Sequence, residues 1–477
     1  MRKTTSKEFR ELCRHFYPGL DKNITYWRFM RYLLFGIKTK EGNLLIDGFH
    51  LSKAENKTHL FIHNNYCGLD FLNKFKLDVM STFSWSKWNY KDKTSRVAYF
   101  QFPKELIDLL EKEKINMKES RVYFDTGKKF TTKQQKVEKE LLKEEARTYF
   151  EFARPEAKEL LAYMNNLPTH SFSKVIAANF NSTFLAASNI ENHLVRDTQL
   201  NILLSIKDEL LPLYKPSVEG KTVRIFPFNY SIPMLKRELR KQLTKGWYEF
   251  DLANSQLAIV GKTWDIKEVQ SFLLEGRKVW EELFTHFGIN YTSLKKEQPA
   301  TYEAIKKVFK DNLYSTVYGM WKNNVSKDVT ARLEAFNIPL GGVTFLKYPL
   351  IKCLFEARDK RLHELSLEGK AKTIFGKDLL VAGGFNKKGL PDDTRRESLR
   401  SILAEQAQAL ELYILLPVLE LAKSTSDFQI TLWMHDGFSV NFPNSSKQDR
   451  WLQKIINVVN EKAKELNVIT YLEVDSL

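Results

Sequence analysis

The feature that most constrains the fold is a strand-to-helix pattern in residues 247–260. Large apolar and polar residues alternate up to Asp251, which predicts a short strand that ends there. Asn254 and Ser255 are residue types that cap helices, so a helix is expected to follow at once. A carboxylate between the end of a strand and the start of a helix is well placed for catalysis. Asp251 is therefore a candidate catalytic residue.

A second acidic residue follows another predicted strand, residues 429–434. His435 and Asp436 come next, and the strand pattern resumes over residues 438–442, which predicts a hairpin with an acidic tip. Two carboxylates on neighbouring strands can share divalent ions about 3.5–4 Å apart, as in the two-metal sites of polymerases and nucleases. We therefore expect Asp251 and Asp436 to be the protein ligands of such a site.

The net charge narrows the choice of partner. The chain has 477 residues, 43% of them hydrophobic, and a formal charge of +16 that is spread along its length. This length allows roughly two to four domains with sizeable cores, and the positive charge suits a polyanion such as nucleic acid. A basic soluble protein without such a partner is the alternative that charge alone leaves open.

Cysteine usage and hydropathy indicate the compartment. Cys13, Cys67 and Cys353 are odd in number and widely spaced, which supports neither a disulfide framework nor a zinc site. No apolar run is expected to span a membrane, and residues 1–10 contain no signal-peptide core. We expect a protein that has no membrane partner and is not secreted. Its location is then intracellular: cytoplasmic, or associated with an organelle, plasmid or phage.

Residues 1–128 are predicted to form a separate mixed α/β domain of unknown role. Strands are expected at residues 43–46 and 58–63. Residues 83–90 hold aromatic rings with lysines between and after them. Such rings can stack on bases, although half-buried packing is the interpretation that this loose pattern favours. No Asp-x-Glu exonuclease signature is found in this region, so we expect no proofreading.

Two helices are predicted after this region. Residues 131–154 are highly charged and have only a narrow apolar stripe, and residues 156–164 form a second helix behind Pro155. The pair is either a solvated linker or a thumb-like projection that grips the backbone of a duplex.

The most informative helix is predicted over residues 299–321. Four apolar residues recur at helical spacing along one face: Ile305, Phe309, Leu313 and Met320. The adjoining face carries two lysines and then two tyrosines, four residues apart and without acids on the same stripe: Lys306, Lys310, Tyr314 and Tyr318. Ammonium groups one turn apart can hold a triphosphate, and a tyrosine one turn further can stack on its base or sugar. A solvated amphipathic helix that happens to carry tyrosines is the alternative.

Arg224 lies in a predicted strand of β-branched and apolar residues, 221–226. An unpaired cation there is costly, so its guanidinium must reach solvent, a carboxylate, or the phosphate or base edge of a ligand. A largely helical region is expected over residues 265–370, and residues 371–377 then predict a strand and a turn.

Three of these segments, taken together, resemble the family A DNA polymerases and the related single-subunit RNA polymerases. The Lys-x3-Lys-x3-Tyr-x3-Tyr-Gly pattern of residues 306–319 is similar to motif B, with lysine where arginine is usual. The stretch around Asp251 resembles motif A, and the His-Asp pair at residues 435–436 resembles motif C. The three segments occur in the order that the family has, and a set of ordered motifs is more specific than any one of them.

Further segments extend the resemblance over about residues 224–477. Residues 222–224 are similar to the Thr-Gly-Arg segment before motif A, with valine in place of glycine. Residues 376–377 resemble the Gly-Arg turn that follows the fingers. Gln406, on a helix predicted over residues 396–416, resembles the glutamine that contacts the minor groove.

The resemblance implies an α+β fold, namely a right-hand polymerase fold with an antiparallel palm sheet, helical fingers and a helical thumb. The domains expected are residues 1–128, an N-terminal domain; 129–220, a thumb-like region; 221–264, the first part of the palm; 265–370, the fingers; and 371–477, the second part of the palm. The activity implied is template-directed addition of dNMP to a primer 3′-hydroxyl, with a DNA primer-template and dNTPs as partners.

The same resemblance assigns roles to single residues. Asp251 and Asp436 are expected to hold two Mg²⁺ ions. Lys306 and Lys310 are implied to contact the incoming phosphates, Tyr314 the base or sugar, and Tyr318 the templating position. Arg224 and Gln406 are implied to contact the primer-terminal pair. His435 is implied to support the primer strand.

Two departures from the family pattern leave alternatives open. Motif A normally has glutamate five residues after its aspartate, and here Gln256 holds that position. Its length should exclude ribose, while its amide can donate a hydrogen bond and so tolerate a 2′-hydroxyl in part. Asp436 is followed by Gly437 rather than glutamate. A single-subunit RNA polymerase or primase, a non-catalytic nucleic-acid-binding replication protein and a two-metal nuclease therefore remain competing hypotheses.

Overall fold

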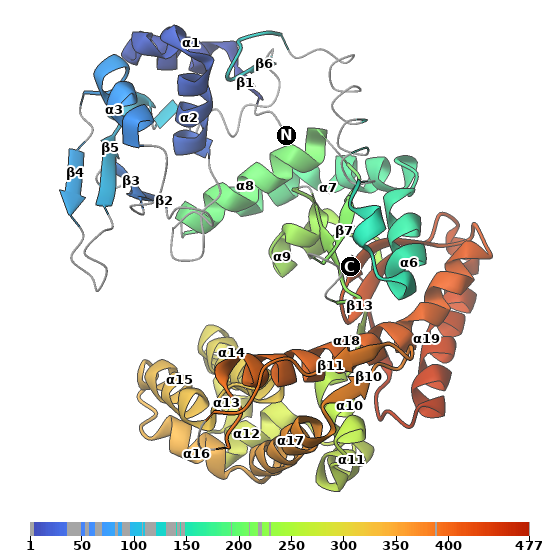
Figure 1. Ribbon diagram of the computed structural model, residues 1–477. Coiled ribbons are helices and arrows are strands. Elements are labelled where there is room, and N and C mark those ends of the chain that lie inside the picture. The colour runs from blue at the N-terminus through green and yellow to red at the C-terminus, as the bar shows by residue number, and fades with distance from the viewer. Residues whose placement is uncertain are drawn as a thin grey trace. The chain divides into compact units, whose positions relative to one another are not determined.

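The computed structural model describes a mixed α+β protein with small antiparallel sheets. The residues that it describes are 4–35, 49–52, 57–62, 69–81, 84–87, 96–106, 108–109, 121–129, 140, 144, 148–191, 193–208, 210–217, 222–228, 230–386 and 389–476. The chain forms two compact units, whose helices and strands are labelled in Figure 1. The first unit comprises Met1–Tyr149, Leu167–Tyr214 and Pro227–Lys245, and the second comprises Phe150–Asn166, Lys215–Phe226 and Gly246–Leu477. Two of the chain's crossings between the units fall in β7 (Tyr214–Pro216) and β8 (Ile225–Pro227).

The first unit combines helices with an antiparallel sheet of order β2-β3-β5-β4. Its N-terminal elements are β1 (Thr4–Ser6), α1 (Lys7–Phe16), the 3-10 helix η1 (Pro18–Lys22), α2 (Ile24–Phe35), β2 (Phe49–Ser52), β3 (Lys57–Ile62), α3 (Leu69–Asp78), β4 (Ser84–Lys87), β5 (Arg96–Gln101) and β6 (Arg121–Tyr123). Its later elements are α7 (His170–Ser188), α8 (His193–Asp208), the 3-10 helix η4 (Ile232–Met234) and α9 (Arg237–Leu243). The strand predicted at residues 58–63 is confirmed as β3 within one residue. The strand predicted at 43–46 and most of the helix predicted at 131–154 lie outside the described residues.

An arginine is built into the aromatic core of the first unit. Arg10 is 5% exposed, and its guanidinium carbon lies 4.1 Å from the centroid of the Trp27 ring. Its Nε donates a hydrogen bond of 3.0 Å to the carbonyl oxygen of Phe124, whose ring also contacts Trp27 edge-on. The apolar side chains of α1, α2 and α3 thereby close around a cation that is hydrogen-bonded and stacked, as a buried charge requires.

The second unit is organised around an antiparallel sheet of order β12-β13-β9-β14. Its strands are β9 (Tyr248–Leu252), β12 (Gln429–Met434), β13 (Gly437–Asn441) and β14 (Leu472–Ser476). The strand ending near Asp251 and the hairpin around His435 and Asp436 are therefore confirmed as elements of one sheet. Two further strands, β10 (Lys370–Lys372) and β11 (Asp378–Leu380), pair as a hairpin where the sequence predicts a strand and a turn.

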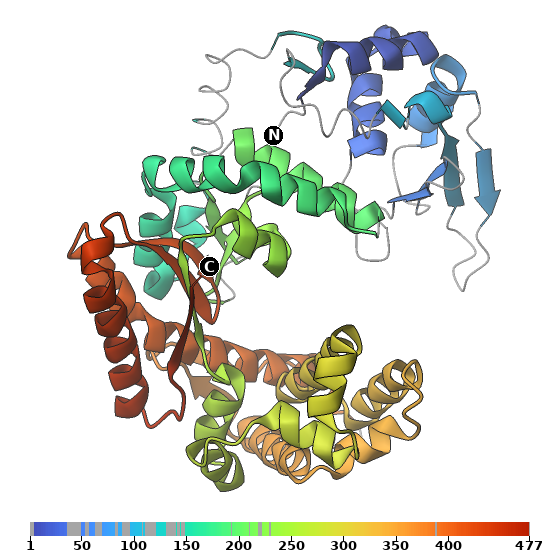
Figure 2. The ribbon, with the colours of Figure 1, turned by 180° about the vertical axis from the view of Figure 1, so that it is seen from behind.

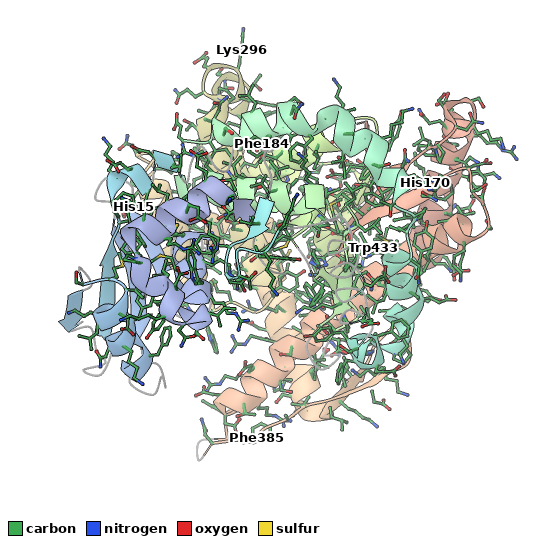
Figure 3. All side chains as sticks on the ribbon, turned by 90° about the horizontal axis from the view of Figure 1, so that it is seen from above. His15, His170, Phe184, Lys296, Phe385 and Trp433 are labelled. Carbon is green, nitrogen blue, oxygen red and sulfur yellow. The ribbon has the colours of Figure 1, made fainter. Side chains whose placement is uncertain are left out.

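A ladder of aromatic rings fixes the register of this sheet. Trp433 on β12 pairs with Phe438 on β13, and Phe438 pairs with Phe250 on β9. The rings stack with centroids 5.8 Å and 5.0 Å apart, and all three side chains are buried (Trp433 is labelled in Figure 3). Because successive side chains alternate between faces, a slip by one residue in one strand would move its ring to the other face of the sheet and break the stack. The ladder therefore also fixes which residue lies opposite Asp251.

Three helices pack against the sheet; they are labelled in Figure 1, and Figure 2 gives the view from behind. They are α6 (Pro155–Asn165), α18 (Asp393–Lys423) and α19 (Gln448–Glu465). Helix α6 contacts β12, α18 contacts both α19 and β12, and α19 contacts β14. The helices predicted over residues 156–164 and 396–416 are confirmed, although α18 is longer than expected at both ends.

By length and composition alone, α18 passes the test for a membrane-spanning helix, and no other helix in the described part of the chain does. The expectation that no apolar run is long enough is therefore wrong for α18. Core helices of soluble proteins meet the same test, and 61% of the apolar window in α18 is buried inside the protein. The signal is weak, because α18 packs against its neighbours in the second unit.

The long helical region between β9 and β10 contains eight helices in the described residues. They are α10 (Ser255–Thr263), α11 (Lys267–Leu274), α12 (Val279–His286), α13 (Tyr291–Glu297), α14 (Pro299–Val317), α15 (Lys322–Glu334), α16 (Gly341–Lys347) and α17 (Pro349–Glu368). The predicted stripe of α14 is buried at Ile305, Phe309 and Leu313, which pack in the core that α11 to α17 share. Solvent reaches the side chains on the helix surface, as Lys296 on α13 shows in Figure 3.

Helix α14 ends earlier than predicted. Gly319 adopts φ +90°, its amide donates to the carbonyl of Thr316, and the amide of Met320 donates to the carbonyl of Ser315. These two bonds are those of a Schellman motif, which favours glycine in the left-handed position. Met320 therefore lies beyond the helix and is 36% exposed, so its assignment to the core stripe is wrong.

Candidate functional site

Asp251 lies near the end of β9, immediately before a strained turn. Two residues connect the strand to α10, and the second, Asn254, adopts a left-handed conformation with φ 50°. Asn254 occupies the N-cap position, as predicted, but its side chain makes no capping hydrogen bond. A non-glycine residue in this conformation is costly and is often found at functional sites. The Asp251 side chain is exposed at this turn.

Asp436 reaches the same place from the β12–β13 hairpin. Its main-chain oxygen accepts a hydrogen bond of 3.1 Å from the amide of Leu252, the residue after Asp251. The preceding residue, His435, is also left-handed, with φ 55°. The next residue, Gly437, pairs directly with Asp251 in the ladder between β13 and β9. The structure therefore places Asp251 on β9 and Asp436 in the turn of the neighbouring β12–β13 hairpin, each close to a turn residue with positive φ.

Gly437 explains why no glutamate follows Asp436. A Cβ atom on residue 437 would lie 2.3 Å from the carbonyl oxygen of Phe250 and 3.1 Å from a carboxylate oxygen of Asp251. The first distance is far shorter than any van der Waals contact, and the atom in the way belongs to the backbone. A side chain at this position would therefore push the two strands apart.

The charges of this carboxylate pair act on Tyr314 of α14, and that of Asp436 also acts on Tyr318, the C-cap residue of the helix. Burial raises the pKa of Tyr314, and the charges of Asp436 and Asp251 raise it further. Burial raises the pKa of Tyr318 to about 12, with Glu411 adding to the shift and Arg224 opposing it by its charge and a hydrogen bond. Both phenols thus stay protonated near neutral pH and can donate hydrogen bonds. Tyr314, Tyr318 and the acidic pair therefore form one electrostatic site.

The two lysines of α14 are more accessible than the tyrosines. Lys310 is exposed, and its Nζ lies 5.6 Å from the centroid of the Tyr314 ring. Lys306 is partly exposed, and its Nζ lies 3.8 Å from a carboxylate oxygen of Glu303. Glu303 lies three residues before Lys306 and thus off the stripe of lysines and tyrosines, which carries no acid, as predicted; an exposed pair of this length contributes little. Lys310 is therefore the better placed cation for an anionic ligand.

Arg224 is tied to a carboxylate that sequence reasoning missed. It lies just before β8 rather than within a strand, and its guanidinium donates a hydrogen bond of 2.7 Å to Glu411 on α18. The Glu411 side chain is 1% exposed. Burial raises the pKa of Glu411 to about 7, against the opposing charge of Arg224. The sequence left open whether the Arg224 guanidinium reaches solvent, a carboxylate or a ligand. In the structure it is bonded to a carboxylate, that of Glu411.

Gln256 is held by the same carboxylate. Its Nε2 donates a hydrogen bond of 2.5 Å to the second oxygen of Glu411, so this N–H is not available to a sugar hydroxyl. Its Oε1 is buried and accepts no hydrogen bond from any described residue. The sequence suggested that the Gln256 amide donates to the sugar; in the structure one of its two N–H groups is bonded to Glu411, and the side chain is only 5% exposed.

His435 and Gln406 differ in their distance from this network. Burial lowers the pKa of His435 to about 4, and the nearby Arg224 charge lowers it further, so the imidazole is neutral at pH 7. Its ring packs edge-on against Phe226 at 5.2 Å. Gln406 instead donates from Nε2 to the carbonyl of Lys372 on β10, at 2.8 Å. Among the residues that the structure describes, Gln406 makes no hydrogen bond or ion pair with the acidic pair, so the structure does not bring it to this network.

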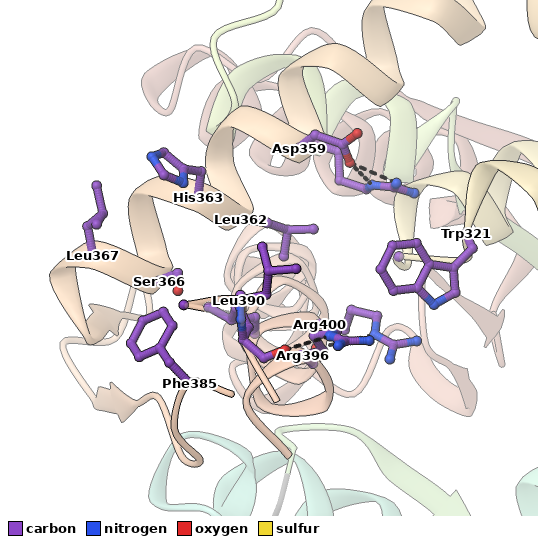
Figure 4. A pocket seen from close by; sticks show the side chains of 15 residues that line it. Trp321, Asp359, Leu362, His363, Ser366, Leu367, Phe385, Leu390, Arg396 and Arg400 are labelled. Atoms are coloured by element: carbon purple, nitrogen blue, oxygen red, sulfur yellow. Dashed lines mark hydrogen bonds and ion pairs between the residues drawn. The ribbon is translucent and has the colours of Figure 1, made fainter. Parts of the chain in front are cut away.

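A pocket of about 570 Å³ lies beside the C-terminal end of α14 (Figure 4). Its wall contains exposed aromatic rings, Trp321 and Phe385, together with Arg396 and Arg400 from α18. The guanidinium of Arg396 lies 5.9 Å from the Trp321 ring. A Cβ on Gly319 would lie 2.5 Å from the Arg400 side chain, so a larger residue at position 319 would clash with Arg400 in the pocket wall. Aromatic rings beside arginines can stack unpaired bases and neutralise their phosphates.

The acidic pair can be tested for its fit to divalent metal. Within the residues that the structure describes, no group of three or more His, Cys, Asp or Glu side chains could hold a metal ion. Asp251 and Asp436 would therefore be the two carboxylates available to a metal ion here. This donor set suits Mg²⁺, which keeps several waters and is bound through one or two carboxylates together with substrate phosphates.

Comparisons with known proteins identify no family. No family model matches the chain, and no curated protein matches it. One solved structure that is similar, the POL domain of Pol1 from M. smegmatis in complex with DNA primer-template and dNTP, has 11% sequence identity and a TM-score of 0.42. The likeness covers 70% of this chain and 64% of that one, so this chain spans less than two thirds of its length. The likeness is distant, and it assigns no role to any residue of this chain.

Proposed function

We propose that the protein is a template-directed DNA polymerase of the family A type, which adds dNMP to a primer 3′-hydroxyl. The observation that carries this proposal is the position of Asp251 and Asp436, adjacent across β9 and β13, in front of the tyrosine face of α14. The order of the three motifs in the sequence agrees with it. A nuclease would need the acidic pair but not the row of lysines and tyrosines beside it.

Asp251 and Asp436 are the residues that would hold Mg²⁺. When bound, two such ions lower the pKa of an attacking hydroxyl and neutralise the phosphates that are transferred and released. The exposed Asp251 and half-buried Asp436 leave room for waters and phosphate oxygens to complete the coordination. The chain itself supplies the carboxylates and the rigid sheet that sets their separation.

Helix α14 is proposed to bind the incoming nucleotide. Lys310 and Lys306 provide positive charge along one face for a triphosphate. Tyr314 presents a protonated phenol one turn from Lys310, near the acidic pair, where a base or sugar would lie. Charge that develops on the phosphate during transfer would be stabilised by a lysine already in place, without reorganisation.

The DNA is proposed to lie on the palm side of the site. Arg224 and the neutral His435 are close to each other and can contact the primer-terminal pair and the primer strand. Tyr318, at the end of α14, directly precedes Gly319, which lines the pocket. This pocket is proposed to receive an unpaired template nucleotide, and Gln406 is proposed to contact the duplex further along.

A single-subunit RNA polymerase is the second candidate. The observation that favours it is the buried Oε1 of Gln256, which has no donor among the described residues and could accept a hydrogen bond from a 2′-hydroxyl. Primer extension on a defined template, with dNTPs or NTPs and Mg²⁺, separates the candidates. We expect extension with dNTPs, no trimming of a mismatched primer end, and no cleavage of DNA in the absence of nucleotides. Extension with NTPs alone would identify an RNA polymerase, and cleavage without extension would identify a nuclease.

A further inference from the structure

Glu411 is the carboxylate in this site to which the sequence assigns no role. It lies in the middle of α18, and the side chains around it on that helix, Leu410, Leu412, Ile414 and Leu415, are buried and apolar. A carboxylate in such surroundings is very costly unless each oxygen finds a partner. Both oxygens do, and their partners come from two different parts of the proposed active site.

The two hydrogen bonds of Glu411 join a proposed DNA contact to a proposed sugar contact. One oxygen accepts from Arg224 at 2.7 Å, and the other accepts from Gln256 at 2.5 Å. Arg224 reaches this point from the segment before β8, whereas Gln256 reaches it from the first turn of α10. Neither side chain has freedom to move without breaking a bond to the same buried group.

The charged and titratable groups that face Glu411 belong to the same site. They are Arg224, Asp436, Tyr314 and Tyr318, each of which interacts electrostatically with it. Arg224 also shares a hydrogen bond with Tyr318, at the end of the α14 nucleotide face. A single connected path therefore runs from Tyr318 through Arg224 and Glu411 to Gln256.

We propose that Glu411 is a positioning residue that couples recognition of the primer-terminal base pair by Arg224 to recognition of the incoming sugar by Gln256. This inference rests on the polymerase function proposed above. The physical reason is that one rigid, buried acceptor orients two donors at once. Losing it should therefore loosen both side chains together, whereas losing Gln256 alone leaves Arg224 held by Glu411.

The test compares substitutions that keep or exchange the hydrogen-bonding groups. Glu411→Gln is isosteric but removes the charge that orients Arg224. The double variant Gln256→Glu with Glu411→Gln exchanges carboxylate and amide, so that the pair still contains one acceptor and one donor. Glu405→Gln is the matched control, because Glu405 is a half-buried carboxylate on the same helix that pairs with Arg154 and Lys377 instead.

Two ratios of kcat/KM are measured for each variant: dNTP over NTP, and a matched over a mismatched primer end. Glu411→Gln is expected to lower both ratios by at least about fivefold. The exchange variant should restore both to within about twofold of wild type, and Glu405→Gln should change neither. Thermal unfolding of each variant shows whether it is folded under the assay conditions.

The outcomes separate this inference from the proposed function. A wild-type protein that extends no primer overturns both. An active wild type whose two ratios are unchanged in a folded Glu411→Gln variant overturns the inference alone, as does a change in one ratio without the other. If Glu411→Gln does not fold, the exchange variant decides, because restored ratios support the coupling and the loss of either contradicts it.

Discussion

Gly437 faces Asp251 across the ladder between β13 and β9, and only a residue without a side chain fits there. The strand that carries Asp436 can approach Asp251 because of this glycine. The separation of the two carboxylates is therefore set by backbone packing, and the aromatic ladder of Phe250 and Phe438 holds it in register.

Gly437→Ala is expected to impair both folding and catalysis. Its Cβ would lie 2.3 Å from the Phe250 carbonyl oxygen, and overpacking of this kind costs about 1–3 kcal/mol of unfolding free energy. Gly384→Ala is the control, because a Cβ there meets only a carboxylate oxygen of Asp392, at 3.5 Å. Denaturant unfolding and primer extension check this prediction. A Gly437→Ala protein with wild-type stability and rate would show that the strands can separate without cost.

Lys310→Ala is expected to lower both turnover and affinity for the nucleotide. The substitution removes an exposed cation near Tyr314, where charge would develop in the proposed phosphoryl transfer, and such contacts are worth roughly tenfold or more in kcat. Lys306→Ala should act mainly on affinity. Lys307→Ala is the control on the same helix, because Lys307 pairs with Asp311 instead. Steady-state kinetics with varied dNTP separates kcat from KM, and unchanged affinity in both variants would exclude α14 as the triphosphate site.

Gln256→Ala is expected to increase the use of ribonucleotides by at least about tenfold, which corresponds to roughly 1.4 kcal/mol. The side chain is buried and fixed by Glu411, so its removal opens space at the first turn of α10. The measurement is the ratio of kcat/KM for dNTP and NTP on one template. An unchanged ratio with normal extension would mean that sugar selection occurs elsewhere.

Trp321→Ala is expected to weaken binding of a primer-template with a single-stranded 5′ template overhang. Trp321 is 52% exposed at the edge of the pocket beside Gly319, and loss of one stacking ring costs about 1–3 kcal/mol per base. Affinity for a blunt duplex should stay the same. Fluorescence anisotropy with both DNAs checks this prediction, and an equal loss for the two DNAs would argue against a template site in this pocket.

Sequence patterns predicted the parts of this fold that depend on local interactions. The alternation of residues 429–434 matches β12 residue for residue, because a strand with a strong apolar pattern needs little from its surroundings. The strand predicted around Arg224 was placed less well. Its amide donates to the side chain of Thr222, a local bond that competes with strand pairing, so β8 begins only at Ile225.

Long-range pairing marks the limit of sequence reasoning about the site. The acidic pair and the tyrosines could be predicted as candidates because each lies in a recognisable local motif. Glu411 lies 187 positions from Arg224 and 155 from Gln256, and nothing near it in the chain indicates either partner. The available signal was a carboxylate in the middle of an apolar helix, together with an arginine that needed a counter-charge.

The most direct test of the account is the chemical step in Asp251→Asn and Asp436→Asn. Each variant loses one carboxylate that would hold Mg²⁺, which should remove several kcal/mol of transition-state stabilisation, or about a thousandfold in rate. Asp427→Asn is the control, because Asp427 lies at the far end of the same hairpin and pairs with Lys447. The measurement is single-turnover primer extension at saturating DNA and dNTP, with DNA affinity measured in parallel. The account predicts that both site variants bind DNA normally but add no nucleotide, while Asp427→Asn behaves as wild type; near-normal extension by either site variant would contradict it.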